Sequence, residues 1–252
     1  METTNYVLYR KLYDTHPTLF TREERKELYK LISDFLTNEQ CKVSNPTAFL
    51  TKNLQIIDIL LNEMSLGKAA VLSLLLIQPS ENNLIDTEKI EKQFNIKIKH
   101  IISGLQRVDE LYRKNVALET ENFRKLLLSM AEDVRVILIM IADRLQTMRN
   151  LEQYEGETQQ QIARESSFLY APLAHRMGLY KVKTELEDLS LKYTNREIYK
   201  DLAKKLNETK RSRDAYIAAF IDPLKEKMKE IGHPFEIKGR TKSIHSIYTK
   251  MR

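Results

Sequence analysis

The sequence predicts a mainly α-helical protein. Its 252 residues include only six glycines and six prolines, so long helices joined by short loops are expected. Apolar residues recur at helical spacing in most segments. Convincing strand alternation occurs at Phe235-Glu-Ile-Lys-Gly239, near the end of the chain. These observations favour a helical bundle followed by the first strand and helices of an α/β domain.

Helix signals follow one another along the chain. Thr21-Arg-Glu-Glu24 has the pattern of a capping box, and Asp86 is placed to cap another helix. Residues 38–49 are interpreted as a polar loop, and Pro79 is expected to stop the helix that precedes it. The predicted helices are 3–14, 22–36, 50–61, 69–77, 87–94, 96–112, 119–130, 134–149, 158–176, 180–193, 196–206, 208–231 and 242–251.

The segment from Asp133 to Leu151 is predicted to organise the bundle. Between Val134 and Ala142 only Arg135 is polar, which is typical of a helix buried nearly all round. Asp143 ends this apolar run. A carboxylate in a core costs several kcal/mol unless it is paired. Its partner is therefore expected to be a metal ion, an arginine or a set of backbone N–H groups.

The composition restricts the class of protein. The chain is 42% hydrophobic and 30% charged, as in ordinary soluble proteins. Cys41 is the single cysteine, so no internal disulfide can form, and the apolar run 69–77 is too short to span a membrane. The N-terminus lacks a signal-peptide pattern, so a cytoplasmic protein is expected. A net charge of +6 permits contact with phosphates or RNA without requiring it.

Four motifs, in this order and spacing, resemble the N-terminal part of the RelA/SpoT homologue family, the long bacterial enzymes that make and break the alarmone (p)ppGpp. They are Asp143-Arg-Leu-Gln-Thr-Met-Arg149, Tyr170-Ala-Pro-Leu-Ala-His-Arg-Met-Gly178, Glu185-Leu-Glu-Asp-Leu189 and residues 238–251.

The resemblance implies a degenerate HD-type (pseudo-hydrolase) domain over 1–155 and a helical connector over 156–196. The start of a nucleotidyltransferase-like synthetase domain over 197–252 would follow. The chain is then expected to be an N-terminal fragment.

The family's hydrolase domain holds Mn²⁺ with a His, a His-Asp pair and a distant Asp. By register, Leu76 and Ile77 replace the His-Asp pair, and Lys52 lies near the position of the first His. Only Asp143 is retained, so Mn²⁺ binding and (p)ppGpp hydrolysis are expected to be absent. Gln146 and Thr147 also replace a His and an Asn of the family motif. Asp143 is then expected to pair with Arg144, Arg149 or Lys52, or to cap backbone groups.

The C-terminal motif resembles the family's ATP-binding loop and helix. The resemblance implies that Arg240 stacks on adenine and that Lys242, Ser246 and Lys250 face phosphate oxygens; the last three share one face of the expected helix. Residues that bind Mg²⁺ and activate the 3′-hydroxyl of GTP or GDP would lie beyond Arg252. The 252 residues are therefore expected to be inactive in synthesis, and ribosome or RNA contact is expected only through regions outside them.

Three functional hypotheses follow. In the first, a catalytically inactive hydrolase domain and its connector regulate a GTP pyrophosphokinase. In the second, a non-catalytic module binds a nucleotide or another partner in the degenerate pocket. A residual hydrolase with a rebuilt site is the third. Glu185, Glu187 and Asp188 are interpreted as a solvated face or as ion-pair partners of Lys181 and Lys183 rather than as a metal cluster. His175 is interpreted as a hydrogen-bonded structural residue.

Overall fold

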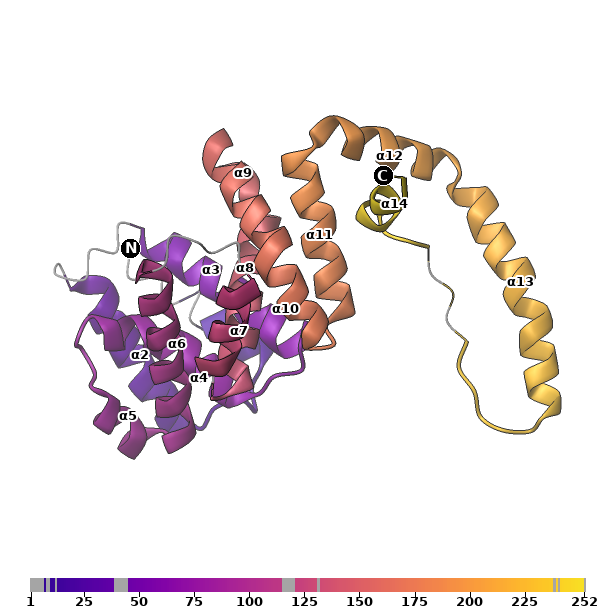
Figure 1. Ribbon diagram of the computed structural model, residues 1–252. Coiled ribbons are helices and arrows are strands. Elements are labelled where there is room, and N and C mark those ends of the chain that lie inside the picture. The colour runs from indigo at the N-terminus through magenta and orange to yellow at the C-terminus, as the bar shows by residue number, and fades with distance from the viewer. Residues whose placement is uncertain are drawn as a thin grey trace.

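The computed structural model describes residues 7–251, except 8, 9, 12, 39–44, 115–120, 131, 238 and 240. Helices are the regular elements of this described part, and it contains no strand. The N-terminal helices form a bundle, against which the helices between residues 156 and 194 pack (Figure 1). Helices α12 (Arg196–Glu208) and α13 (Lys210–Glu230) extend away from the bundle, and the chain then returns so that the C-terminal helix α14 (Ile244–Met251) lies beside α12.

The bundle has seven described α-helices and one π-helical turn after residue 21. They are α2 (Arg22–Thr37), α3 (Pro46–Asp58), the π turn η2 (Ile59–Glu63), α4 (Lys68–Glu81), α5 (Thr87–Gln93), α6 (Ile96–Lys114), α7 (Glu121–Met130) and α8 (Val134–Arg149). The predicted first helix, 3–14, falls largely outside the described residues. Its described positions 7, 10, 11, 13 and 14 are helical.

The predicted capping residues do cap their helices. Thr21 Oγ1 accepts from the Glu24 N–H at 3.2 Å, and Glu24 Oε2 accepts from the Thr21 N–H at 2.8 Å. Asp86 accepts from two N–H groups of α5. The loop predicted over 38–49 is wrong at its end, because α3 begins at Pro46 with the Asn45 side chain accepting from the Ala48 N–H. Asparagine at the cap followed by proline is a helix-start signal that the apolar spacing concealed.

The predicted stop at Pro79 is also wrong, since α4 continues to Glu81. A proline in the last turn lacks only its own N–H, whose helical acceptor would be the carbonyl of Leu75. The turn still closes, because the Asn82 N–H donates to the Gln78 carbonyl at 3.1 Å. Helix α4 is therefore long enough to pack along α6 and α2 as well as α8.

Helix α8 is the central element, as predicted. It contacts α3, α4 and α6, and also α10 (Ala171–Arg176) and α11 (Tyr180–Thr194). It approaches α6 closely at Gly104, where an added Cβ would lie 2.7 Å from Val136 Cγ2. Most of the surface of α8 is buried, but its first residue, Val134, is 53% exposed. The fully or nearly buried residues of α8 are Val136, Ile137, Ile139, Ile141, Ala142, Leu145, Gln146 and Met148.

Asp133 is expected to stabilise the start of α8. Its carboxylate accepts from the Arg135 N–H and from Arg135 Nε, both at 2.9 Å, and the Arg135 guanidinium holds the pKa of Asp133 below its ordinary value of 3.8. Asp133→Ala should cost about 1–2 kcal/mol of unfolding free energy at pH 7. Because the folded-state pKa is lowered, this contribution is complete above pH 4 and is lost as the pH falls through the folded pKa.

Urea unfolding at pH 7 and pH 3 checks this expectation, with the exposed neighbour Glu132→Ala as the control. A deficit for Asp133→Ala that does not shrink at acid pH would contradict the assigned ion pair.

Residues 156–196, for which the name connector is kept below, begin with a continuous run of three helical segments, predicted as one helix over 158–176. They are α9 (Gly156–Glu165), the π turn η4 (Ser166–Tyr170) and α10 (Ala171–Arg176). Gly178 then breaks the run with φ of +73°, a conformation that favours glycine. Helix α11 (Tyr180–Thr194) returns along α8 and α9.

Three helices complete the described chain: α12 (Arg196–Glu208), α13 (Lys210–Glu230) and α14 (Ile244–Met251). The strand predicted at 235–239 is not formed at its described residues. A strand needs a neighbour for its backbone groups, and the described chain offers none. The helix predicted from Lys242 begins two residues later, with Ser243 Oγ accepting from the Ser246 N–H at 3.2 Å. Helix α14 packs against α11 and α12.

Candidate functional site

Asp143 pairs with a lysine from the neighbouring helix. Lys52 Nζ of α3 lies 2.7 Å from Asp143 Oδ1 of α8. Of the three cationic partners considered from the sequence, the structure selects Lys52. The expectation of a core carboxylate is wrong, however, because the Asp143 side chain is 47% exposed and that of Lys52 is 43% exposed. A pair this open to water is worth about 0–1 kcal/mol, so it neutralises charge more than it stabilises the fold.

A second pair lies one helical turn further along the same two helices. Gln146 Nε2 donates to Gln55 Oε1 at 2.8 Å. Thr147 turns back on its own helix and donates to the Asp143 carbonyl at 3.0 Å. The two residues that depart from the family motif are thus satisfied within α3 and α8.

Leu76 lies in the hydrophobic core. It belongs to α4, and none of its surface is exposed. Ile77 is half-buried and packs against the same core. Leucine and isoleucine have no donor atom for a metal, and the Lys52 ammonium repels a cation, so the residues present do not fit Mn²⁺. In the described part of the chain, no three His, Cys, Asp or Glu side chains gather closely enough to hold a metal ion.

Arg144 has carboxylate and aromatic neighbours of its own. It pairs with Glu165 at 3.0 Å, lies over the Tyr170 ring at 4.3 Å and donates to the Tyr170 hydroxyl at 3.3 Å. The Tyr112 and Tyr170 hydroxyl oxygens are 2.9 Å apart, and burial raises the pKa of Tyr112. This network joins α6, α8 and the connector.

Arg149 binds two carboxylates at once. Its guanidinium contacts Glu63 of η2 at 2.6 and 2.9 Å and Glu185 of α11 at 2.7 Å through two nitrogens. The hydrogen bonds that Arg149 donates to Glu185, and then those to Glu63, raise the pKa of Arg149 above its ordinary value. The bundle and connector are therefore linked by a charged clamp at the end of α8.

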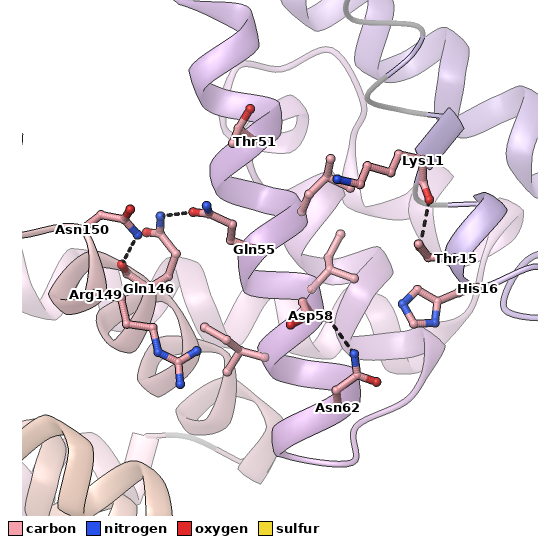
Figure 2. Close-up of a pocket in the computed structure, with 13 residues that line it drawn as sticks. Lys11, Thr15, His16, Thr51, Gln55, Asp58, Asn62, Gln146, Arg149 and Asn150 are labelled. Carbon is pink, nitrogen blue, oxygen red and sulfur yellow. Dashed lines mark hydrogen bonds between the residues drawn. The ribbon is translucent and has the colours of Figure 1, made fainter.

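A cavity of about 830 Å³ lies beside the Gln55–Gln146 pair. Figure 2 shows Thr51, Gln55, Asp58 and Asn62 along α3 and η2 between two other groups of side chains. Gln146, Arg149 and Asn150 lie on one side, and Lys11, Thr15 and His16 on the other. Asn62 Nδ2 donates to Asp58 Oδ1 at 2.6 Å. The lining combines four amide side chains, Gln55, Asn62, Gln146 and Asn150, with the charged side chains of Lys11, Asp58 and Arg149.

The C-terminal candidates lie together in part. Lys242, Ser246 and Lys250 line one cavity, although Lys242 precedes α14 rather than belonging to it. Arg240 falls outside the described residues. The Asp188 carboxylate of α11 accepts from the His245 N–H at 2.8 Å and from the Ile244 N–H. Burial raises the pKa of Asp188, and these two hydrogen bonds oppose the rise.

The predicted acidic face of α11 is engaged in contacts with other parts of the described structure. Glu187 pairs with Lys183 at 2.7 Å, as one of the alternatives anticipated, whereas Glu185 pairs with Arg149 and Asp188 caps α14. His175 is exposed and lies edge-on to the Tyr180 ring. Sequence reasoning missed Gln55, Glu63 and Asp188 as contact residues. Asp188 lies 57 positions from its partner, beyond the reach of any local pattern.

The sequence of the bundle and of the helices that follow it matches the model of a known domain family. Residues 36–180 match the HD domain family. The chain is 36% identical over 209 residues to a GTP pyrophosphokinase of Myxococcus xanthus, covering 81% of this chain and 27% of that protein. It is 33% identical over 195 residues to the bifunctional (p)ppGpp synthase/hydrolase SpoT of Escherichia coli, covering 76% and 28%. A guanosine-3′,5′-bis(diphosphate) 3′-pyrophosphohydrolase of Vibrio cholerae is 35% identical over 196 residues, covering 77% and 28%.

The chain belongs to the RelA/SpoT homologue family and carries its HD domain. It spans less than a third of the length of these relatives. None of the described helices has the length and hydropathy needed to cross a bilayer.

Proposed function

We propose that this chain provides a non-hydrolytic, regulatory HD domain and its connector to a cytoplasmic GTP pyrophosphokinase of the stringent response. The complete protein would transfer pyrophosphate from ATP to the 3′-hydroxyl of GTP or GDP, with Mg²⁺ as its cofactor. The domains would divide at residues 155 and 196. In this proposal Arg240 stacks on the adenine of ATP, and Lys242, Ser246 and Lys250 contact its phosphates.

The proposed loss of hydrolysis rests mainly on the contact between Lys52 and Asp143. The Lys52 ammonium lies 2.7 Å from the Asp143 carboxylate, so the retained acid already has a cationic partner. Leu76, aligned with a metal ligand of the family, is enclosed in the apolar core. Without imidazole and carboxylate ligands the domain cannot position a metal-bound water of lowered pKa against a 3′-pyrophosphate.

The regulatory role is supported by the contacts between bundle and connector. Arg149 of α8 reaches Glu185 on α11, and Arg144 of α8 reaches Glu165 on α9. A displacement of α8 would therefore be transmitted to the helix whose Asp188 caps α14. Such a chain of contacts allows a domain without catalytic activity to influence the nucleotide-binding segment.

Incubation of the chain with ppGpp and Mn²⁺ is expected to release no pyrophosphate above the no-protein rate. The physical reason is the missing donor set, since lysine, leucine and isoleucine occupy three ligand positions. The Escherichia coli SpoT protein, assayed in parallel, is the positive control. Pyrophosphate release that requires Asp143 would contradict the proposal and favour a rebuilt hydrolase site.

The alternative is a binding module that holds a nucleotide without cleaving it. The amide-lined cavity of about 830 Å³ beside α3 and α8 favours this reading. Titration with labelled ppGpp, GDP and ATP separates the two functions. Metal-independent binding that is lost in Gln55→Leu would support the module, whereas no binding at this cavity supports a scaffold.

A further inference from the structure

A second cavity lies at the seam between the connector and α14. Its volume is about 360 Å³, and we call it the seam cavity. Its described lining consists of four basic side chains and four hydroxyl side chains, without a carboxylate. The basic residues are His175, Lys183, Lys242 and Lys250, and the hydroxyl residues are Tyr180, Thr184, Ser243 and Ser246.

The two lysines on the α14 side lie close together. Both line the seam cavity, and the neighbouring Lys250 side chain holds the pKa of Lys242 below its ordinary value. Two like charges at such a separation repel each other, and a bound anion between them would remove the repulsion.

Lys183 provides a cation from the opposite wall. Its Nζ lies 2.7 Å from Glu187 on the same helix, and Glu187 also lies 3.4 Å from His245 Nδ1. Glu187 therefore neutralises Lys183 and helps to hold the first turn of α14. The side chain of Lys183 is 27% exposed, so its ammonium is positioned by its surroundings more than a free surface lysine would be.

The two walls are held in place by backbone capping. Asp188 of α11 accepts from the N–H groups of Ile244 and His245, which ties the start of α14 to the connector. Ser243 Oγ donates to Ser246 Oγ at 2.9 Å. The seam cavity is thus a site formed jointly by α10, α11 and α14.

We propose that the seam cavity binds an oligophosphate chain, with Lys183 of the connector contributing a charge-assisted hydrogen bond alongside Lys242 and Lys250. A linear oligophosphate carries several negative charges in a row, and the basic groups on both walls and the hydroxyl groups offer matching donors. The proposal deepens the proposed function, on which it rests, by making the connector part of the phosphate site. The ligand is either the phosphate tail of a nucleotide or a free inorganic oligophosphate.

Calorimetric titration of the 252-residue chain with inorganic tripolyphosphate tests the proposal. Lys183→Gln and Lys250→Gln should each weaken binding about tenfold, because each removes one charged donor. The matched control is Lys181→Gln, which makes the same charge change on α11 outside the cavity lining and should leave affinity within about twofold. Circular dichroism melting establishes that each variant is folded.

A substitution that is expected to strengthen binding distinguishes a specific effect on the cavity from a general loss of structure. Glu187→Gln removes the carboxylate that neutralises Lys183 and should strengthen tripolyphosphate binding several-fold, to roughly three times the original affinity or more. A destabilised seam could not produce tighter binding. If Lys183→Gln fails to fold, this variant and Thr184→Val carry the test.

The outcomes separate this inference from the proposed function. If Lys250→Gln weakens tripolyphosphate binding but Lys183→Gln does not, the proposed contact of Lys183 with phosphate is overturned. The proposed phosphate contacts of Lys242 and Lys250 would then remain. Unchanged binding in both variants, or no binding by the parent chain, would overturn the phosphate site at the seam cavity, whereas the proposed loss of hydrolysis is tested separately by pyrophosphate release from ppGpp. A parallel titration with ATP identifies the source: tighter binding than tripolyphosphate supports a nucleotide, and equal binding supports a free oligophosphate.

Discussion

The substitution Leu76→His is expected to lower the free energy of unfolding by about 3–5 kcal/mol. Leu76 has no exposed surface and packs in the core between helices of the bundle. An imidazole there would lose the apolar transfer energy of leucine. It would also bury two nitrogen atoms that α4 and its neighbours cannot both satisfy.

Added Mn²⁺ is expected not to recover this loss. Ile77 and Lys52, which the family resemblance places at or near the other replaced ligand positions, supply no metal ligand. Urea unfolding of Leu76→His with and without Mn²⁺ measures the effect. Gln78→His, two residues further on in a half-buried position of the same helix, is the matched control and should cost less than about 1 kcal/mol. Recovery of the parent midpoint on adding Mn²⁺ would mean that a metal site persists.

The substitution Arg149→Met is expected to cost about 2 kcal/mol, the second-largest effect. The guanidinium is 33% exposed and joins Glu63 to Glu185, so its removal leaves two carboxylates facing each other without a counter-charge. Because α8, η2 and α11 meet there, the loss should also weaken the attachment of the connector to the bundle. Hydrogen exchange of α11 and η2 is expected to quicken more than that of α4.

Arg113→Met provides the comparison for this result. Arg113 pairs with Asp109 at 2.7 Å but is 76% exposed, so its removal should cost less than about 0.5 kcal/mol. In a double-mutant cycle, Arg149→Met and Glu185→Gln should show a coupling energy of about 1 kcal/mol that falls in high salt. Equal effects of Arg113→Met and Arg149→Met would show that the clamp is an ordinary surface pair.

Local patterns were sufficient to predict most helices and the central place of α8. The capping box at Thr21 and Glu24 and the cap at Asp86 involve groups two to three residues apart, so sequence alone contains both partners. The errors have local causes as well. Asn45 and Pro46 start α3 within a stretch that looked like a loop, and Pro79 lies in a last turn that tolerates its missing N–H.

The side-chain contacts of the candidate site could not be predicted from local sequence patterns. The register that assigns Leu76, Ile77, Lys52 and Asp143 to ligand positions follows from the motifs. Which cation would meet Asp143 depended on how α3 packs against α8, since Arg144 and Arg149 lie closer in sequence than Lys52. Those two arginines instead face Glu165, Glu63 and Glu185, because the helical turn directs them to other sides of α8.

The residues of this chain therefore establish the helical class and the family, since these depend on composition, period and motif. The Lys52–Asp143 pair, the Arg149 clamp and the seam cavity depend on side chains from segments 36 to 91 positions apart. Periodicity specifies which face of a helix is apolar, whereas the packing of helices specifies which charges meet. Asp143, which the apolar run suggested was buried, is consequently a half-exposed acid paired with a lysine.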